Sequence, residues 1–212
     1  MSSHSTKSHI VLACAAVLGA MVPLVSHAES AVTTGAGTPL TASARLDFRV
    51  AVPKVLFLQV GTGTNLGTNA AVNLIDFTVP AGNVGDGTPV AASAASGDLG
   101  AGVVTAKVIG NNGAVSLTST STGALSNGAG DTISFSQIAT AATVLTSATP
   151  LAAPTIVDGG VSATVTVPAA GKIVNRDARW TFSYLNTAAV PPGTYGGVNA
   201  NNGRVIYTAS MP

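Results

Sequence analysis

Apolar and polar side chains alternate along residues 45–52, directly after a stretch that has no hydrophobic period. The apolar positions are Leu46, Phe48, Val50 and Val52, and the polar positions are Arg45, Asp47 and Arg49. Because successive side chains of a β-strand point to opposite faces, this alternation predicts a strand with one apolar and one polar face. Pro53 interrupts the pattern, and the apolar run over residues 55–58 predicts a second, more fully buried strand.

Further strands are predicted where short runs of β-branched and aromatic residues lie between clusters of glycine, asparagine and proline. These runs are residues 72–79, 103–109, 115–118, 133–138, 161–167, 178–184 and 205–211. The sequence Gly-Asn-Asn-Gly at residues 110–113 separates two valine-rich runs and is the strongest hairpin signal. Residues 138–145 have helical spacing diluted by threonines, so at most one short helix is expected. Residues 80–102, rich in alanine, glycine and serine, predict a long loop.

Short strands without alternating helices predict an all-β fold. We expect a single antiparallel β-sandwich of about eight or nine strands, immunoglobulin-like or pilin-like, over residues 44–212. Residues 29–43 are small or polar and lack a period, and they predict a flexible N-terminal arm. No unit repeats at a fixed spacing, which disfavours solenoids and propellers.

The first 28 residues have the layout of a secretory signal peptide. The N-terminal region, residues 1–9, contains Lys7 and no acidic residue. An apolar run follows at residues 10–25, and a Ser-His-Ala cleavage site ends at Ala28. The run is shorter than the ~20 residues that span a bilayer, so we expect cleavage after Ala28, export to the bacterial surface through the periplasm, and no transmembrane helix. The alternative is a lipobox that ends at Cys14, but most of the apolar run follows this cysteine.

The composition of the remaining chain excludes much chemistry. Lys7 is the one basic residue among the first 28, so residues 29–212 carry eight basic and eight acidic side chains, which argues against nucleic acid as a partner. The same residues contain neither histidine nor cysteine. Nucleophilic triads built on histidine and zinc or copper sites built on imidazole or thiolate are therefore excluded. The few carboxylates are scattered, so we expect no catalytic residues, cofactor or metal, and not an enzyme.

The last third of the chain contains a strand, a corner and a final strand. The face of the first strand that we expect in the core consists of Trp180, Phe182 and Tyr184. Pro192 and Gly193 predict a chain reversal, and Tyr195 is placed to form a hydrogen bond across it. The core face of the final strand is predicted to be Val205, Tyr207, Ala209 and Met211.

This order of elements, with a Pro-x-Gly-x-Tyr corner at residues 191–195, resembles the end of bacterial fimbrial subunits of the chaperone–usher type. It is less closely similar to the WxL cell-surface domain. The resemblance implies a subunit that polymerises with itself or related subunits, with a periplasmic chaperone and an outer-membrane usher as partners. Two features depart from the fimbrial pattern: residues 29–212 cannot form a disulfide, and Tyr207 lies further from the end than the usual near-terminal tyrosine.

Two functions remain open at this point. The first is a structural subunit of a bacterial surface fibre or layer, in which Leu46, Phe48, Val50 and Val52 form the apolar face of a strand that completes a neighbour's sheet. The alternative is that residues 46–52 form an ordinary first strand of the subunit's own sheet, as most such strands do. The second function is a monomeric secreted binding module that contacts a ligand through loops at residues 80–102 and 120–130.

Overall fold

The computed structural model describes residues 29–212. The predicted signal peptide, the lipobox cysteine Cys14 and the cleavage site at Ala28 lie outside the described residues. The chain divides into two units between Ala51 and Val52, and the second unit, Val52–Pro212, contains every strand found among residues 29–212. Residues 44–51, which were expected to belong to the sandwich, therefore fall in the N-terminal unit.

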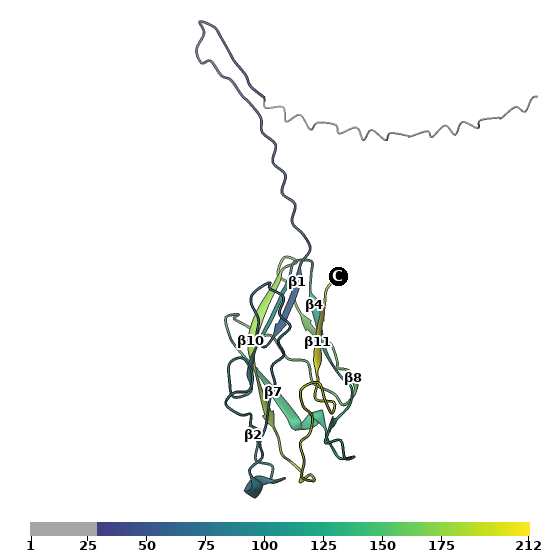
Figure 1. The fold of residues 1–212 in the computed structure, drawn as a ribbon. Coiled ribbons are helices and arrows are strands. Elements are labelled where there is room, and N and C mark those ends of the chain that lie inside the picture. The colour runs from purple at the N-terminus through teal and green to yellow at the C-terminus, as the bar shows by residue number, and fades with distance from the viewer. Residues whose placement is uncertain (1–28) are drawn as a thin grey trace, which may run out of the picture. The chain divides into compact units, whose positions relative to one another are not determined.

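The unit from Val52 onward is an all-β sandwich, which confirms the predicted fold class (Figure 1). The first sheet contains β1 (Leu56–Val60), β2 (Val90–Ala91), β3 (Val103–Gly110), β7 (Ile138–Thr143) and β10 (Val174–Tyr184). The second contains β4 (Val115–Ser121), β8 (Gly160–Val161), β9 (Val165–Val167) and β11 (Ile206–Ser210). A small ribbon pairs β5 (Leu125–Ser126) with β6 (Thr132–Ile133), and two short 3₁₀ helices are η1 (Ala81–Asn83) and η2 (Phe135–Gln137).

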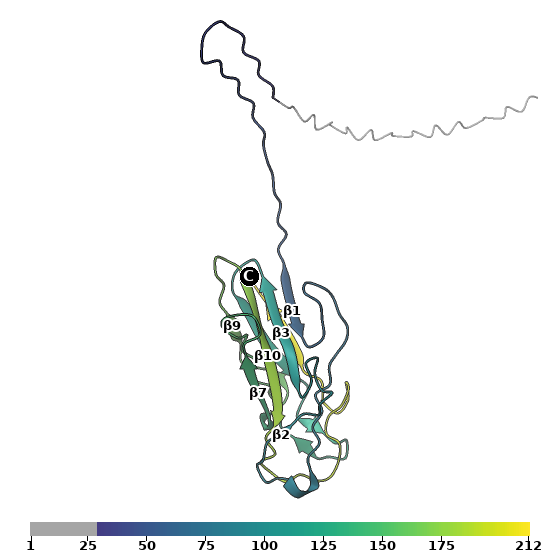
Figure 2. The ribbon, with the colours of Figure 1, turned by 90° about the vertical axis from the view of Figure 1, so that its left-hand side faces the viewer.

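All of these pairings are antiparallel, and they leave β1 and β11 at edges of their sheets. In the first sheet β3 lies between β1 and β10, and β7 pairs with β10 (Figure 2). In the second sheet β4 pairs with β11 and, elsewhere, with β8 and β9. Each sheet therefore has one edge that belongs to the first or the last strand of the sandwich.

The core lies between the sheets and is filled by every second residue of the long strands. Buried and half-buried positions alternate along β3, β4 and most of β10, as the two-residue period of a strand requires. Trp180 is fully buried, its ring centroid lies 5.2 Å from that of Tyr207, and its Nε1 donates a hydrogen bond to the Leu151 carbonyl at 2.7 Å. This single aromatic side chain thus contacts the last strand and anchors a buried loop.

Several predicted elements take another form. Residues 72–79 form only an isolated bridge between Phe77 and Ala92, rather than a strand. The segment for which a helix was considered contains strand β7, whose backbone pairs with that of Arg179–Tyr184 in the sheet. The predicted strand at residues 133–138 is divided between β6, η2 and the first residue of β7, and the one at residues 161–167 is divided between β8 and β9.

The strongest hairpin signal is also wrong, since residues 110–113 connect the two sheets and do not join paired strands. β3 and β4 each bury one face against the core, so the chain crosses from one sheet to the other at this turn. A Cβ on Gly110 would lie 3.1 Å from Met211 Sδ and from Val115 Cγ2. The missing side chain therefore lets Val115 of β4 and Met211, just after β11, pack closely against the backbone at Gly110. Local turn chemistry could not show which sheet receives the next strand.

Candidate strand-addition site

Residues 46–52 form no strand and no bridge within the described chain. The first strand of the described residues is β1. The apolar side chains of residues 46–52 are largely exposed: the exposed fractions of Leu46, Phe48, Val50 and Val52 are 73%, 85%, 86% and 77%. Exposed apolar side chains in a continuous row are typical of an interaction surface, because isolated apolar residues rather than rows are the norm on a soluble protein.

The N-terminal unit has few internal contacts of its own among residues 29–51. Glu29 accepts two hydrogen bonds from Arg45, at 2.6 and 3.0 Å, and this carboxylate–guanidinium pair lowers the pKa of Glu29. The Thr33 hydroxyl donates to the Thr41 carbonyl at 2.9 Å. Neither interaction covers the apolar row that follows Arg45.

One edge of β1 has no strand partner. The Asn111 N–H donates to the Val55 carbonyl, and the Gly61 N–H donates to the Thr105 carbonyl, so the odd-numbered residues face β3. Because backbone groups alternate in direction along an antiparallel pair, the N–H and C=O groups of Leu56, Leu58 and Val60 point away from β3. Within residues 29–212, no backbone hydrogen bond joins these groups to another strand.

The free edge of β11 lies beside that of β1, on the same side of the sandwich (Figure 1). The two strands run in opposite directions, as is seen from the closeness of the residues before β1 to the end of the chain. There the Lys54 ammonium donates a hydrogen bond to the Pro212 carbonyl. The structure pairs β11 with β4 and pairs β1 with β3, and it shows no ladder between β1 and β11.

Apolar side chains line this side of the sandwich without being fully buried. They pack against the core and remain partly exposed: Leu58, Val60, Ile75, Phe77, Val205, Tyr207, Ala209 and Met211. The ring of Tyr207 packs against Trp180 in the core, and this burial raises the pKa of Tyr207 well above its usual range. We call the free edges of β1 and β11, with these side chains, the open edge.

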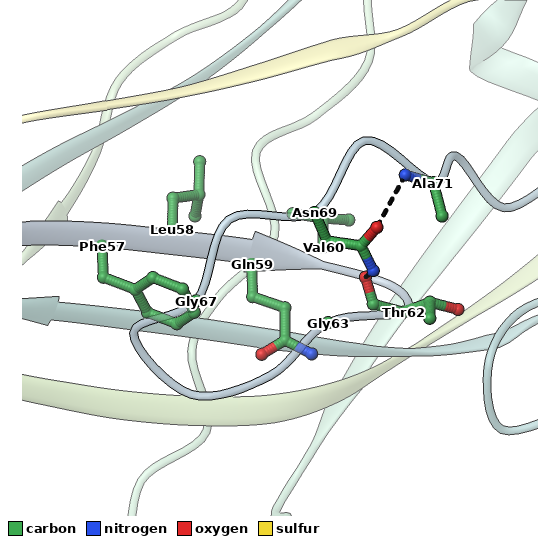
Figure 3. A pocket seen from close by; sticks show the side chains of 9 residues that line it. All are labelled: Phe57, Leu58, Gln59, Val60, Thr62, Gly63, Gly67, Asn69 and Ala71. Atoms are coloured by element: carbon green, nitrogen blue, oxygen red, sulfur yellow. Dashed lines mark hydrogen bonds between the residues drawn. The ribbon is translucent and has the colours of Figure 1, made fainter.

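A loop borders β1 at the open edge without pairing with it (Figure 3). This loop, residues 62–71, forms a small pocket with β1 that is lined by Phe57, Leu58, Gln59 and Val60. Its hydrogen bonds are internal or reach the next segment: Asn69 Oδ1 accepts from the Ala71 N–H at 2.9 Å, and Thr62 N–H donates to Asn73 Oδ1 at 2.7 Å. None of these hydrogen bonds joins the loop to the backbone of β1.

The predicted core face and corner of the C-terminal module come together as follows. The side chains of Trp180, Phe182 and Tyr184 are buried on β10, and Tyr207 packs against Trp180. The Tyr195 hydroxyl donates to the Pro191 carbonyl at 2.7 Å, across the reversal at Pro192 and Gly193. Partial desolvation and, secondarily, the negative charge of Asp131 raise the pKa of Tyr195. Trp180, Phe182 and Tyr184 therefore belong to the core, and Tyr195 closes the corner that precedes β11.

Sequence reasoning missed the role of Asp177, which it treated only as one of several scattered carboxylates. Asp177 is buried, although it lies on the face of β10 opposite to the core-facing residues Ala178 and Trp180. Burial by itself would raise the pKa of this carboxyl, but hydrogen bonds from the Thr146 hydroxyl and N–H and from the Ser147 N–H outweigh it and lower the pKa to about 2. Asp177 thereby holds the loop after β7 on the sheet.

No group of three or more His, Cys, Asp or Glu side chains gathers in a metal-binding arrangement among residues 29–212. In the same part of the chain, no helix is long and apolar enough to span a membrane. The sequence and the fold match no known protein family, no curated protein and no solved structure.

Proposed function

We propose that this chain is an exported structural subunit of a bacterial surface fibre, in which residues 46–52 of one copy add a strand to the open edge of the next. One observation carries the proposal: a chain that exposes an unpaired apolar row also exposes an unpaired, apolar-lined edge between β1 and β11. In β-strand addition the backbone supplies hydrogen bonds and alternate side chains fill apolar positions, and the two surfaces provide these two halves.

The energetics favour such an addition. Burying a large apolar side chain stabilises a complex by roughly 1.5–3 kcal/mol, and residues 46–52 offer four of them on one face. The polar face formed by Arg45, Asp47 and Arg49 would remain in water, as the outer face of an added strand requires. An edge strand that accepts a partner also removes its own tendency to aggregate without order.

The geometry of the contact leads to a linear assembly. Residues 46–52, which we call the donor segment, and the open edge are different surfaces of one chain, so the interface is heterologous. Heterologous contacts that do not close into a ring generate open filaments. A subunit with an exposed apolar edge also needs protection during export, which fits the periplasmic chaperone and outer-membrane usher that the fimbrial resemblance implies.

The variant Phe48→Asp tests this proposal, with Arg49→Asp as its matched control. Both introduce an aspartate into the donor segment, the first on the apolar face and the second on the polar face. A buried, unpaired carboxylate is strongly unfavourable. We therefore expect filaments of wild type and Arg49→Asp in negatively stained preparations of the chain from Glu29 onward, and a folded monomer of Phe48→Asp by light scattering.

The opposite result has a clear form. If the wild type stays monomeric at high concentration and residues 46–52 exchange their amide hydrogens as fast as an unstructured peptide, these residues add to no edge. The fibre proposal then fails, and a monomeric secreted binding module becomes the better description of the chain.

A further inference from the structure

The donor segment is followed so closely by β1 that the chain could, in principle, complete its own open edge. Residues 53–55 are all that separate Val52 from Leu56. A reversal there would place Val52 opposite Leu56, Val50 opposite Leu58 and Phe48 opposite Val60. Residues directly opposite each other in an antiparallel pair point to the same face, and Leu58 and Val60 face the core. The self-paired hairpin would therefore have the correct register.

Self-pairing would also have a large kinetic and thermodynamic advantage over addition to another chain. A segment tethered by a short linker acts at an effective concentration in the millimolar range, without any dependence on the amount of protein. A self-completed subunit would have no free donor and no free edge, so it could not enter a fibre. Something in residues 53–55 must disfavour the reversal if the chain is to polymerise.

The side chain of Asn111 holds the linker from the side of β1 that faces β3, opposite to the free edge on which a reversed segment would lie. Asn111 Nδ2 donates to the Pro53 carbonyl at 2.7 Å, and Asn111 Oδ1 accepts from the Val55 N–H at 2.8 Å. The Asn111 N–H also donates to the Val55 carbonyl at 3.3 Å. These three bonds continue the β1–β3 ladder beyond Leu56, because in an extended chain the polar groups of Pro53, Val55 and Phe57 all face the same neighbour.

One residue of the linker acts in the same direction. A common three-residue hairpin loop ends in a residue with left-handed backbone conformation, which a β-branched residue such as Val55 strongly disfavours. Pro53 restricts the preceding residue, Val52, to extended conformations, which both the straight chain and the hairpin contain. Val55 therefore opposes a turn at residues 53–55, whereas Pro53 is compatible with either form.

We propose that Asn111 is a positioning residue that holds residues 53–55 in line with β1 and so directs the donor segment to a second copy of this chain. The inference rests on the proposed function and adds its control: the linker is a hinge with a closed, self-paired form and an extended, polymer-forming form. Hinge loops of this kind decide between closed monomers and strand-swapped assemblies. The amide of Asn111 stabilises the extended form.

The experiment compares Asn111→Ala with Asn112→Ala in the chain from Glu29 onward. Asn112 lies in the same turn but donates to the Pro212 carbonyl, so its loss leaves both side-chain bonds to the linker intact. Removing two hydrogen bonds should raise the ratio of monomer to polymer by about 10- to 100-fold in Asn111→Ala and leave it near the wild-type value in Asn112→Ala. Light scattering over a concentration series gives the ratio, and hydrogen exchange reports on residues 46–52.

The expected monomer of Asn111→Ala has residues 46–52 protected from exchange, because they pair with their own β1. Val55→Gly is a second variant that leaves Asn111 in place and makes the turn conformation accessible, and it should shift the ratio in the same direction. If both variants polymerise like the wild type, Asn111 does not direct the donor segment to a second copy, although strand addition itself stands. A monomeric Asn111→Ala with unprotected residues 46–52 also overturns the inference, since Asn111 would then support only the acceptor edge.

The wild type separates the remaining outcomes. A monomeric wild type with protected residues 46–52 would show that the chain closes on itself in spite of Asn111, which overturns the inference. A monomeric wild type with unprotected residues 46–52 removes the proposed function and the inference with it.

Discussion

The two lateral sides of the sandwich differ in how completely the core is covered. On the side away from β1 and β11, the loop of residues 144–157 enters the core, and its Leu151, Pro154 and Ile156 are buried. On the side of β1 and β11, partly exposed apolar side chains reach the surface and no ladder joins the two strands. One side therefore contributes a complete core, and the other side offers an incomplete one.

Hydrogen bonds explain how the loop of residues 144–157 seals its side, because they link it to both sheets. From the first sheet, Trp180 Nε1 donates to the Leu151 carbonyl and the Asp177 carbonyl accepts from the Leu151 N–H. From the second sheet, the Ser119 hydroxyl donates to the Thr155 carbonyl at 3.1 Å and the Ser121 hydroxyl donates to the Val157 carbonyl. Buried backbone groups of a loop need such partners, and inward-facing serines supply them here.

The difference separates stability from assembly in this molecule. Substitutions on the sealed side should change the free energy of unfolding of the subunit and leave the donor segment and the open edge intact. Substitutions at the open edge should change assembly and leave the subunit nearly as stable as before. Three predictions follow this division, in order of decreasing effect on stability.

The largest effect is expected for Trp180→Ala in the centre of the core, where the side chain contacts both the loop of the sealed side, at Leu151, and Tyr207 of β11. The substitution leaves a cavity in the core, removes the contact with Tyr207 and leaves the Leu151 carbonyl without its donor. We expect the free energy of unfolding to fall by about 3–5 kcal/mol, as for other truncations of buried aromatic residues. Urea unfolding followed by circular dichroism measures the change. A decrease below about 1 kcal/mol would contradict the central place of Trp180 in the core.

A smaller effect, with a characteristic pH dependence, is expected for Asp177→Asn. An amide cannot replace the carboxylate as acceptor of all the bonds from Thr146 and Ser147, so stability at pH 5 should fall by about 1–3 kcal/mol. The pKa of Asp177 is lowered in the folded state from 3.8 to about 2. A lowered pKa means that the folded state favours the ionised form, so this contribution is present above pH 4 and is lost as the pH falls toward 2.

The comparison of wild type and Asp177→Asn between pH 5 and pH 2 therefore has a defined outcome. The wild type should lose more stability than the variant over this interval, and the two curves should converge near pH 2. Parallel curves would show that the carboxylate of Asp177 does not hold the loop through its charge.

The sequence predicted the strands of the sandwich better than the way its sides are closed. Runs of β-branched and aromatic residues between turn formers located β3, β4, β11 and the later part of β10. Alternation marked residues 46–52 as strand-like, but a period cannot show whether a strand has a partner in its own chain. The burial of Asp177 and the hydrogen bonds of Asn111 to the linker depend on segments that approach from distant parts of the sequence. Local patterns contain no information on such contacts.

The smallest effect on stability, combined with a large effect on assembly, is expected for Ala209→Leu at the open edge. Ala209 is the smallest of the partly buried side chains near the end of the chain, and Tyr207 and Met211 lie on either side of it in the alternation. In the proposed assembly a donor side chain packs over Ala209, and a leucine there would obstruct this contact. Because the position is open to the surface, we expect the free energy of unfolding to change by less than about 1 kcal/mol.

Thr208→Leu provides the matched control, since it introduces the same side chain on the same strand but on its outward face. We expect Ala209→Leu to remain monomeric or to assemble much more slowly than the wild type, and Thr208→Leu to assemble at the wild-type rate. Light scattering over time measures both rates, and urea unfolding confirms that both subunits are folded. Equal rates for the two variants would mean that the donor does not enter the space beside Ala209, and the acceptor surface would then have to be sought elsewhere on the sandwich.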